Sequence, residues 1–139
     1  MSLVQLFYVS RAAIPYDTEA VKAILAISRR NNHWDDVTGC LLFSGCFFAQ
    51  VLEGRSDVTS GRLDQISADT RHVGFRLLVE RPIALREYGD WSMGYLHNLA
   101  LEDELEDLLV HSSIPPERII AVRDRMKPDT IMGALSTSF

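Results

Sequence analysis

The sequence is poor in the residues that mark disulfide-stapled, nucleic-acid-binding and membrane-spanning proteins. Its two cysteines, Cys40 and Cys46, are too few for a disulfide framework. It has 14 basic against 19 acidic residues and a net charge of −5, which argues against nucleic acid or an anionic membrane as partner. Its longest apolar stretch, residues 40–52, is interrupted by serine, glycine and glutamine, so it is too polar to span a bilayer.

Signals for export are also lacking. The N-terminal segment MSLVQLFYVS has no basic residue ahead of its apolar ones, unlike a secretory signal peptide. We interpret both cysteines as reduced core residues, and together these features predict a cytoplasmic protein. A chain of 139 residues with 47% hydrophobic and 24% charged residues is typical of one globular domain with its own core.

Motifs of the common enzyme classes are missing as well. The four histidines show no metal-ligand spacing, so we expect no metal site. The sequence contains no GxSxG, P-loop or GxGxxG motif. The cysteines lie in predicted strands without a nearby basic partner, and we expect no catalytic thiol.

Alternation and helical periodicity predict an α+β fold of the order β-α-β-β-α-β-β. We predict strands at 3–10, 38–43, 46–52, 73–80 and 90–96, and helices at about 18–32 and 56–68. This is the split βαβ order of a ferredoxin-like sandwich, in which a mixed five-stranded sheet carries two helices on one face. Two further amphipathic helices, at about 99–110 and from 115, are expected to cover the opposite face.

Three polar residues are predicted to converge between the sheet and its first two helices. Tyr8 lies on the first strand, Gln50 on the third, and Asn32 at the end of the first helix. Strands one and three are neighbours in this fold. Such groups, buried together, must bond each other or a ligand. The residues alone favour a satisfied network in a plain core, with a ligand site as the alternative.

Four segments, in this order, resemble those of the BLUF domains, which are blue-light sensors using FAD. They are LVQLFYVS, NNHWDDVTGCLLFSGCFFAQVLEG, ISADTRH and DWSM. The resemblance covers about residues 2–97. A short chain with two C-terminal helices is similar to the stand-alone members of the family. We therefore expect a flavin-binding domain at 1–97 and a helical extension at 98–139.

The resemblance implies a noncovalently bound FAD between the two helices, with FMN left open. Apolar residues would clamp the faces of the ring, an asparagine would bond its carbonyl and imide edge, and basic residues would reach the ribityl or phosphate end. The residues implied in binding are Ile24, Arg30, Asn31, Asn32, Gln50, Ile66, Arg71 and His72.

The resemblance also implies photochemistry without turnover, so we do not expect an enzyme. Tyr8 would give an electron and a proton, and Gln50 would relay the proton and rearrange. Ser10, Trp91 and Met93 are the implied output residues. Trp91 and Met93 are expected on one face of the fifth strand, with one of them beside Gln50. The output would be a changed contact with a partner protein or between subunits.

Other functions of the same topology remain as alternatives. An acylphosphatase-type enzyme would need a phosphate-binding loop with an early arginine, and Arg11 followed by two alanines is a poor version of one. An RNA-binding module would use the aromatic pair Phe47-Phe48 as a stacking platform, but the acidic charge counts against it. A flavin-binding relic without signalling is disfavoured by the presence of both Tyr8 and Gln50.

Overall fold

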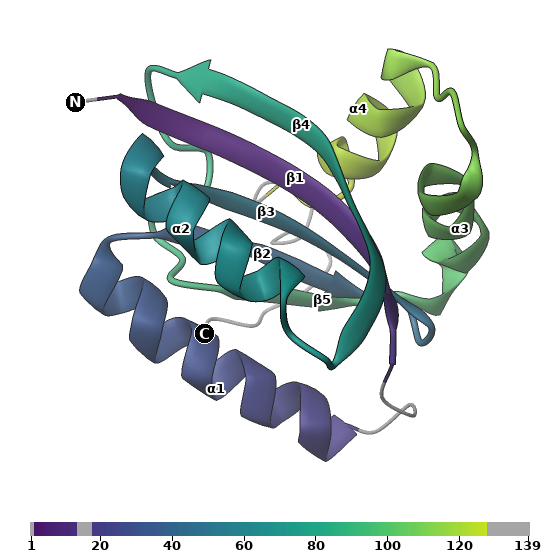
Figure 1. Ribbon diagram of the computed structural model, residues 1–139, viewed down its shortest axis with the longest axis horizontal. Helices are drawn as coiled ribbons and strands as arrows, with labels where there is room; N and C mark the ends of the chain where they lie inside the picture. The colour runs from purple at the N-terminus through teal and green to yellow at the C-terminus, as the bar shows by residue number, and fades with distance from the viewer. Residues whose placement is uncertain (1, 14–17, 128–139) are drawn as a thin grey trace.

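The computed structural model describes residues 2–13 and 18–127 of the chain (Figure 1). Its helices and strands follow the predicted order and continue into a helical C-terminal part. They are β1 (Leu3–Ala12), α1 (Thr18–Asp35), β2 (Thr38–Phe43), β3 (Phe47–Arg55), α2 (Ser56–Ser67), β4 (His72–Ile83), β5 (Gly94–His97), the 3₁₀ turn η1 (Leu99–Leu101), α3 (Glu102–Val110) and α4 (Pro116–Asp124).

The five strands form one mixed sheet in the order β4-β1-β3-β2-β5. Strand β1 runs antiparallel to β3 and β4, whereas β5 joins the edge strand β2 in parallel. This arrangement confirms the ferredoxin-like α+β fold. It also makes β1 and β3 neighbours and places Tyr8 directly opposite Gln50.

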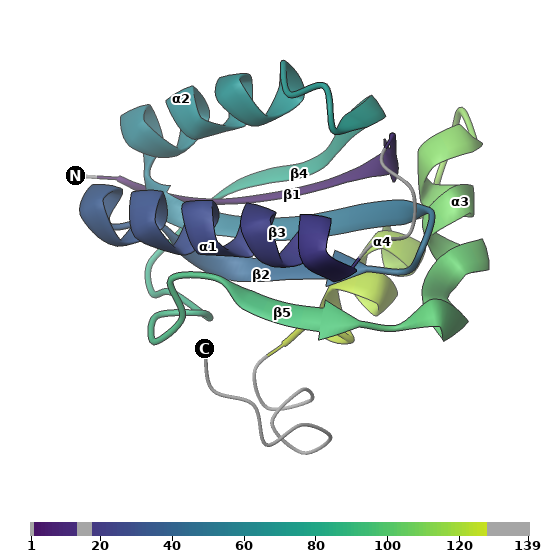
Figure 2. The ribbon, with the colours of Figure 1, turned by 90° about the horizontal axis from the view of Figure 1, so that it is seen from below.

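Each face of the sheet carries a separate apolar core, because successive side chains of a strand point to opposite faces. Helices α1 and α2 cover one face, and α3 and α4 lie on the other side (Figures 1 and 2). On β1, Leu6 packs in the core under α1 and α2, and Phe7 and Val9 pack in the core under α3 and α4.

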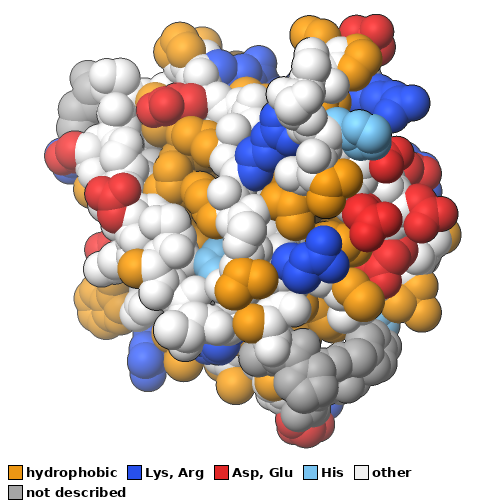
Figure 3. All heavy atoms as spheres, turned by 45° about the vertical axis from the view of Figure 1, so that its right-hand side comes forward, with side chains coloured by type: hydrophobic (Ala, Val, Ile, Leu, Met, Phe, Trp, Pro, Cys, Tyr) orange, Lys and Arg blue, Asp and Glu red, His pale blue; other side chains and the backbone are white. Residues whose placement is uncertain are grey.

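The C-terminal helices cover the face that the sequence predicts for them. Leu105 and Leu108 of α3 and Val122 of α4 are buried in the same core as Phe7 and Val9. The acidic side chains of α3 lie on its outer side, where they gather on the surface (Figure 3). The expected coverage of the second sheet face is therefore confirmed.

The fifth strand differs from its prediction, because it begins at Gly94 rather than at residue 90. The residues before it form a loop that is anchored to β3 by the buried carboxylate of Glu53, which accepts hydrogen bonds from the N–H groups of Glu87 (3.0 Å) and Tyr88 (2.8 Å). Pairing with β2 starts only at Cys40 and Gly94.

Trp91 and Met93 both lie in this loop and pack on opposite faces of the sheet. The expectation that they share a strand face is therefore wrong. Trp91 packs against the core under α3 and α4, and Met93 is buried in the core under α1 and α2. Gly94, the first residue of β5, lies directly against the Trp91 side chain. The Trp91 ring lies so close that a Cβ atom at Gly94 would meet it at 2.2 Å, which only glycine tolerates.

Strands β3 and β4 are longer than predicted. Pairing continues along the whole of β1, whose Leu3 is opposite both Arg55 of β3 and Ile83 of β4. Helix α1 also continues to Asp35, beyond its predicted end at residue 32. In β3 and β4, Gly54 and Pro82 are turn-forming residues, but both still pair with β1, and this pairing overrides their low strand propensity.

Arg55 occupies the N-cap position of α2 without a side-chain cap, and the N–H of Ser56 bonds the carbonyl of Ser2 at 3.0 Å. Cys46 is exposed rather than in the core, since it lies in the turn before β3 that Gly45 forms with a φ of 116°. Cys40 is buried as expected.

None of the helices within residues 2–13 and 18–127 has both the length and the apolar content needed to cross a bilayer.

Candidate functional site

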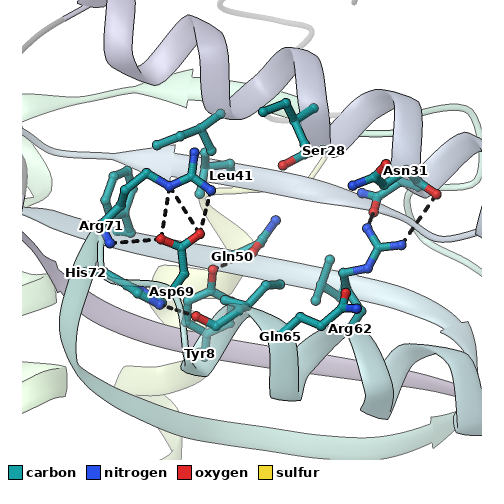
Figure 4. A pocket seen from close by; sticks show the side chains of 16 residues that line it. Tyr8, Ser28, Asn31, Leu41, Gln50, Arg62, Gln65, Asp69, Arg71 and His72 are labelled. Atoms are coloured by element: carbon teal, nitrogen blue, oxygen red, sulfur yellow. Dashed lines mark hydrogen bonds and ion pairs between the residues drawn. The ribbon is translucent and has the colours of Figure 1, made fainter.

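A cleft between α1 and α2, floored by the sheet, is the candidate site (Figure 4). It encloses about 810 Å³ of empty space, counting its open mouth. Seven of the eight residues implied in binding line it, together with Tyr8. These seven are Ile24, Asn31, Asn32, Gln50, Ile66, Arg71 and His72.

Tyr8 and Gln50 form a hydrogen-bonded pair on the floor of the cleft. Their opposite positions on β1 and β3 bring the Tyr8 hydroxyl to 2.5 Å from Gln50 Oε1, to which it donates. Both side chains are at least 95% buried. Burial raises the pKa of the Tyr8 phenol well above its usual value, and the nearby Asp69 carboxylate adds to the rise. The phenol therefore stays protonated at physiological pH.

The other end of the Gln50 amide contacts Met93, whose Sδ lies 3.3 Å from Nε2. The expectation that one of the two output residues lies beside Gln50 is met by Met93. Trp91 lies on the opposite side of the sheet. The single amide of Gln50 thus links the phenol of Tyr8 to the segment that leads into β5.

Asn32 is held in the cleft by two partners from outside α1. It is 1% exposed, and its Nδ2 donates to the Ser92 carbonyl at 2.8 Å. Its Oδ1 accepts a hydrogen bond from Nη1 of Arg62 at 2.7 Å. Arg62 is a site residue that the sequence analysis missed. The available signal was its position four residues before Ile66, which places both on one face of α2.

The other end of the cleft carries Arg71, His72 and Asp69, with Tyr8 and Gln50 between them and Arg62 (Figure 4). Arg71 pairs with Asp69 through Nε at 3.0 Å, and this hydrogen bond holds the pKa of the Asp69 carboxyl below its usual range. Arg71 lies in the turn after α2, and His72 is the first residue of β4.

His72 connects this end of the cleft to an implied output residue. Its Nδ1 lies 2.7 Å from the Ser10 hydroxyl, and its Nε2 contacts the carbonyl of Ile66. Ser10 and His72 are both buried. Ser10, two residues along β1 from Tyr8, is therefore connected to the site by its contact with His72.

Arg30 is the implied binding residue that the structure does not bring to the cleft. The cleft-facing positions of α1 are 24, 27, 28, 31 and 32, which follow the helical repeat. Position 30 is off this stripe, and its side chain is exposed. Its neighbour Arg29 instead donates through Nε to the Met93 carbonyl at 3.1 Å.

The arrangement suits a flat aromatic ligand with a polar edge and an anionic tail. Ile24 of α1 and Ile66 of α2 offer apolar walls, and Asn32 and Gln50 offer amides at the floor. Arg71 supplies a cation for a phosphate. Within the part of the chain that the structure describes, no three His, Cys, Asp or Glu side chains gather where they could hold a metal ion. The apolar walls, the amides and the arginine of the cleft fit the flavin that the resemblance implies.

Comparison with known proteins assigns the family. Residues 3–94 match the family model described as BLUF, sensors of blue-light using FAD. The chain belongs to the BLUF family. The dark-state structure of BlrB, a BLUF protein, superposes with a TM-score of 0.76 at 30% sequence identity, covering 96% of this chain and 98% of that chain.

Two curated relatives share the BLUF part alone. Photoactivated adenylate cyclase subunit beta of Euglena longa is 32% identical over 98 residues, which make up 69% of this chain and 11% of that protein. The blue light- and temperature-regulated antirepressor BluF of Escherichia coli (strain K12) is 35% identical over 98 residues, or 68% of this chain and 22% of that protein. This chain thus spans less than a quarter of either relative.

BLUF membership favours the light-sensor function over the acylphosphatase-type enzyme and the RNA-binding module. The family consists of blue-light sensors, its cofactor is FAD, and the domain senses light rather than catalysing a reaction. An acylphosphatase-type enzyme and an RNA-binding module find no support in these comparisons. The output parts of the relatives belong to those proteins and do not define the partner of this one.

Proposed function

We propose that this chain is a photoreceptor in which Tyr8 gives an electron and a proton after blue-light absorption, and Gln50 converts that event into a changed hydrogen-bond pattern. The observation that carries the proposal is the buried hydrogen bond from Tyr8 to Gln50 on the floor of the flavin cleft. When bound, FAD would supply the light absorption and the electron acceptor.

Tyr8 is suited to transfer the electron and the proton together. Its phenol is buried and remains protonated, so it enters the reaction as a neutral donor. Oxidation makes a phenol strongly acidic. The proton leaves Oη along the existing hydrogen bond to Gln50 Oε1, and it returns by the same route when the electron returns.

Gln50 is suited to keep a record of the event. Its amide has an acceptor toward Tyr8 and a donor toward the Met93 sulfur. Turning the amide by half a rotation exchanges these roles, so the bonds to Tyr8 and to Met93 change together. Tautomerisation to an imidic acid would also reverse them. Both routes start from the same arrangement, in which the Gln50 amide oxygen accepts the hydrogen bond from Tyr8.

The signal would leave through the segment from Trp91 to Met93. Three side chains of the site hold it: Gln50 contacts the Met93 sulfur, Asn32 bonds the Ser92 carbonyl, and Arg29 bonds the Met93 carbonyl. This segment continues directly into β5, η1 and α3. A change at Gln50 therefore alters one of three contacts on a segment that leads to the C-terminal helices.

In this proposal residues 1–97 are the light-sensing part, and residues 98–139 carry the output. The receiver is a protein partner or a second copy of the chain, and the setting is the cytoplasm. The support for a protein partner is the family, whose members include photoactivated cyclases with additional parts. The support for output through 98–139 is that α3 and α4 share a core with the sheet.

The variant Gln50→Leu tests the role of the amide. Leucine is apolar but similar in volume to glutamine, so FAD binding is retained within a few-fold. The hydrogen bonds to Tyr8 and Met93 are lost. We expect a flavin absorption spectrum with no reversible red shift after blue light. The measurement is absorption before and after illumination, with wild type as the positive control. A normal reversible shift in Gln50→Leu contradicts the proposal.

A further inference from the structure

Arg62 on α2 lies at the site but belongs to none of the sequence motifs that define it. Its side chain is 11% exposed and lines the cleft beside Asn32. Nη1 donates to Asn32 Oδ1 at 2.7 Å, and Nη2 pairs with the Asp35 carboxylate and lies 3.4 Å from the Asn31 carbonyl. One guanidinium on α2 thus contacts three residues of α1 across the cleft. Figure 4 shows Arg62 reaching from α2 toward Asn31 of α1.

The partners of Asn32 fix which way its amide points. A guanidinium can only donate, so it must face Oδ1, whereas the Ser92 carbonyl can only accept, so it must face Nδ2. Turning the amide by half a rotation would place two donors together and two acceptors together. Because Asn32 is 1% exposed, water cannot replace the lost bonds.

This orientation leaves a defined pair of groups for a ligand. A primary amide has two N–H donors and two acceptor lone pairs, and the protein uses one of each. One N–H and one lone pair of Asn32 therefore remain at the wall of the cleft. They complement a ligand edge that carries a carbonyl beside an N–H, and the imide edge of a flavin has this pattern.

We propose that Arg62 is a positioning residue that fixes the amide of Asn32 for the imide edge of the flavin. The inference rests on the proposed flavin site and adds a residue to it. Without Arg62, the Asn32 oxygen loses its donor from α2, and the Ser92 carbonyl alone holds the amide in its orientation. A purely structural role, in which Arg62 only ties α2 to α1 through Asp35, makes a different prediction. It lowers stability without altering how the flavin carbonyls are bonded.

The test uses the full chain loaded with FAD and the variants Arg62→Leu and Arg62→Lys. In Arg62→Leu we expect FAD to dissociate about tenfold more readily, as for loss of one charge-assisted hydrogen bond. We also expect the flavin carbonyl stretching bands in the dark infrared spectrum to shift. Arg62→Lys keeps a donor and a charge, so it should restore the bands toward their wild-type positions.

Two controls separate positioning from stability. Arg55→Leu removes the same charge at the start of α2, where Arg55 pairs with the exposed Asp57, and it should leave the bands and the FAD affinity unchanged. Asp35→Asn breaks the ion pair but leaves the Arg62–Asn32 bond possible, so it should lower the melting temperature without shifting the bands.

Wild-type bands and wild-type FAD affinity in Arg62→Leu would overturn the inference and leave the proposed function intact. If Arg62→Leu does not fold, Asp35→Asn and Arg62→Gln replace it. Flavin carbonyl bands that shift in Arg62→Gln but not in Asp35→Asn support a positioning role. Bands at the same position in both variants overturn it. A wild-type chain that binds no flavin contradicts the proposed function itself, and this inference with it.

Discussion

The chemistry of Tyr8 follows from where its phenol is buried. The ring packs 4.8 Å from Phe75, centroid to centroid, and its hydroxyl has the Gln50 oxygen as acceptor. A phenol in such surroundings does not ionise at ordinary pH, because burial disfavours the phenolate. It is therefore a neutral electron donor whose proton already has a destination.

The variant Tyr8→Phe keeps the ring and removes the transferable proton. We expect bound FAD, a folded protein and no light-induced red shift, because phenylalanine is far harder to oxidise than tyrosine. Transient absorption should show an excited flavin that decays without the product state. Full yield of the signalling state in this variant would require another electron donor and would contradict the role given to Tyr8.

Cys40 predicts a pH dependence of stability. Burial raises the pKa of its thiol from 9.0 to about 12, so the folded state keeps a proton that the unfolded chain loses. The unfolded state then binds fewer protons, and the free energy of unfolding falls as pH rises from about 9 to 12. For this group the slope is about 1.4 kcal/mol per pH unit.

Chemical denaturation at pH 8, 9 and 10 measures this effect, and Cys40→Ala should make the decline shallower. The comparison does not go above pH 10, so the buried Tyr8 and Tyr88, whose pKa values are also raised, contribute least. An identical decline in wild type and Cys40→Ala would show that the thiol is not the group responsible.

At the residue scale, the sequence predicts the chemical types at the site better than their partners. Tyr8, Asn32 and Gln50 are recognisable because strand alternation and neighbouring strands place them together. Arg62 was missed because its partner Asn32 lies 30 residues earlier on another helix, and no local pattern pairs them. Arg30 does not line the cleft, and a resemblance does not resolve which flank of α1 faces it.

At the scale of elements, the loop before β5 decides how the site is connected to the rest of the fold. Buried Glu53 holds it at Glu87 and Tyr88, and Gln5 and Glu53 are also bonded at 2.8 Å. Gln5 in turn accepts a hydrogen bond from Arg123 of α4 at 3.0 Å. The Glu53 carboxylate therefore anchors the loop at Glu87 and Tyr88. Through Gln5 it is also linked to Arg123 of α4.

The sequence could not reveal this loop, because its residues alternate as a strand would. The segment WSMGYLH places Trp91, Met93 and Tyr95 at strand spacing, which predicted a strand from residue 90. The hydrogen bonds to Glu53 override that pattern, and Glu53 is 34 residues away in sequence from Glu87. Strand propensity is routinely overridden by such contacts.

The different positions of Trp91 and Met93 predict different variant effects. In Met93→Ala we expect the photocycle to survive, since Tyr8 and Gln50 are intact. Light-induced changes at α3 and α4, followed by hydrogen exchange, should become smaller because the contact to Gln50 is gone.

Trp91→Ala is the matched comparison. It removes packing on the other face of the sheet and should lower the free energy of unfolding by roughly 3 kcal/mol. The contact between Met93 and Gln50 is not altered in this variant, because Trp91 lies in the core under α3 and α4. Backbone changes of full size at α3 and α4 in Met93→Ala would show that the signal leaves the site by another path.

At the scale of the whole molecule, the sheet is a shared floor between a light-sensing cleft and a helical cover. Both sheet faces are predictable from the alternation of β1, β2 and β3, and so is the need for a second cover. The order of the strands follows from the ferredoxin-like pattern. What the sequence does not contain is the surface that receives the signal, since this depends on a partner.

Truncation after Asn98 tests the role of the cover. It removes Leu105, Leu108 and Val122 from the core and exposes Phe7 and Val9, at a cost of about 25 cal/mol for each Å² of apolar surface. We expect self-association or aggregation in light scattering. A chain ending after Lys127, which keeps α3 and α4, is the control. A truncated protein as stable and monodisperse as this control would contradict the packing argument.

The most direct test of the account is the absorption spectrum of the purified wild-type chain, recorded before and after blue light. The account predicts an oxidised flavin spectrum in the dark, a small red shift on illumination, and full recovery in darkness. The flavin should be released on denaturation, since it is bound without a covalent link. A colourless protein, or a flavin spectrum that does not shift reversibly while Tyr8 and Gln50 are intact, would contradict it.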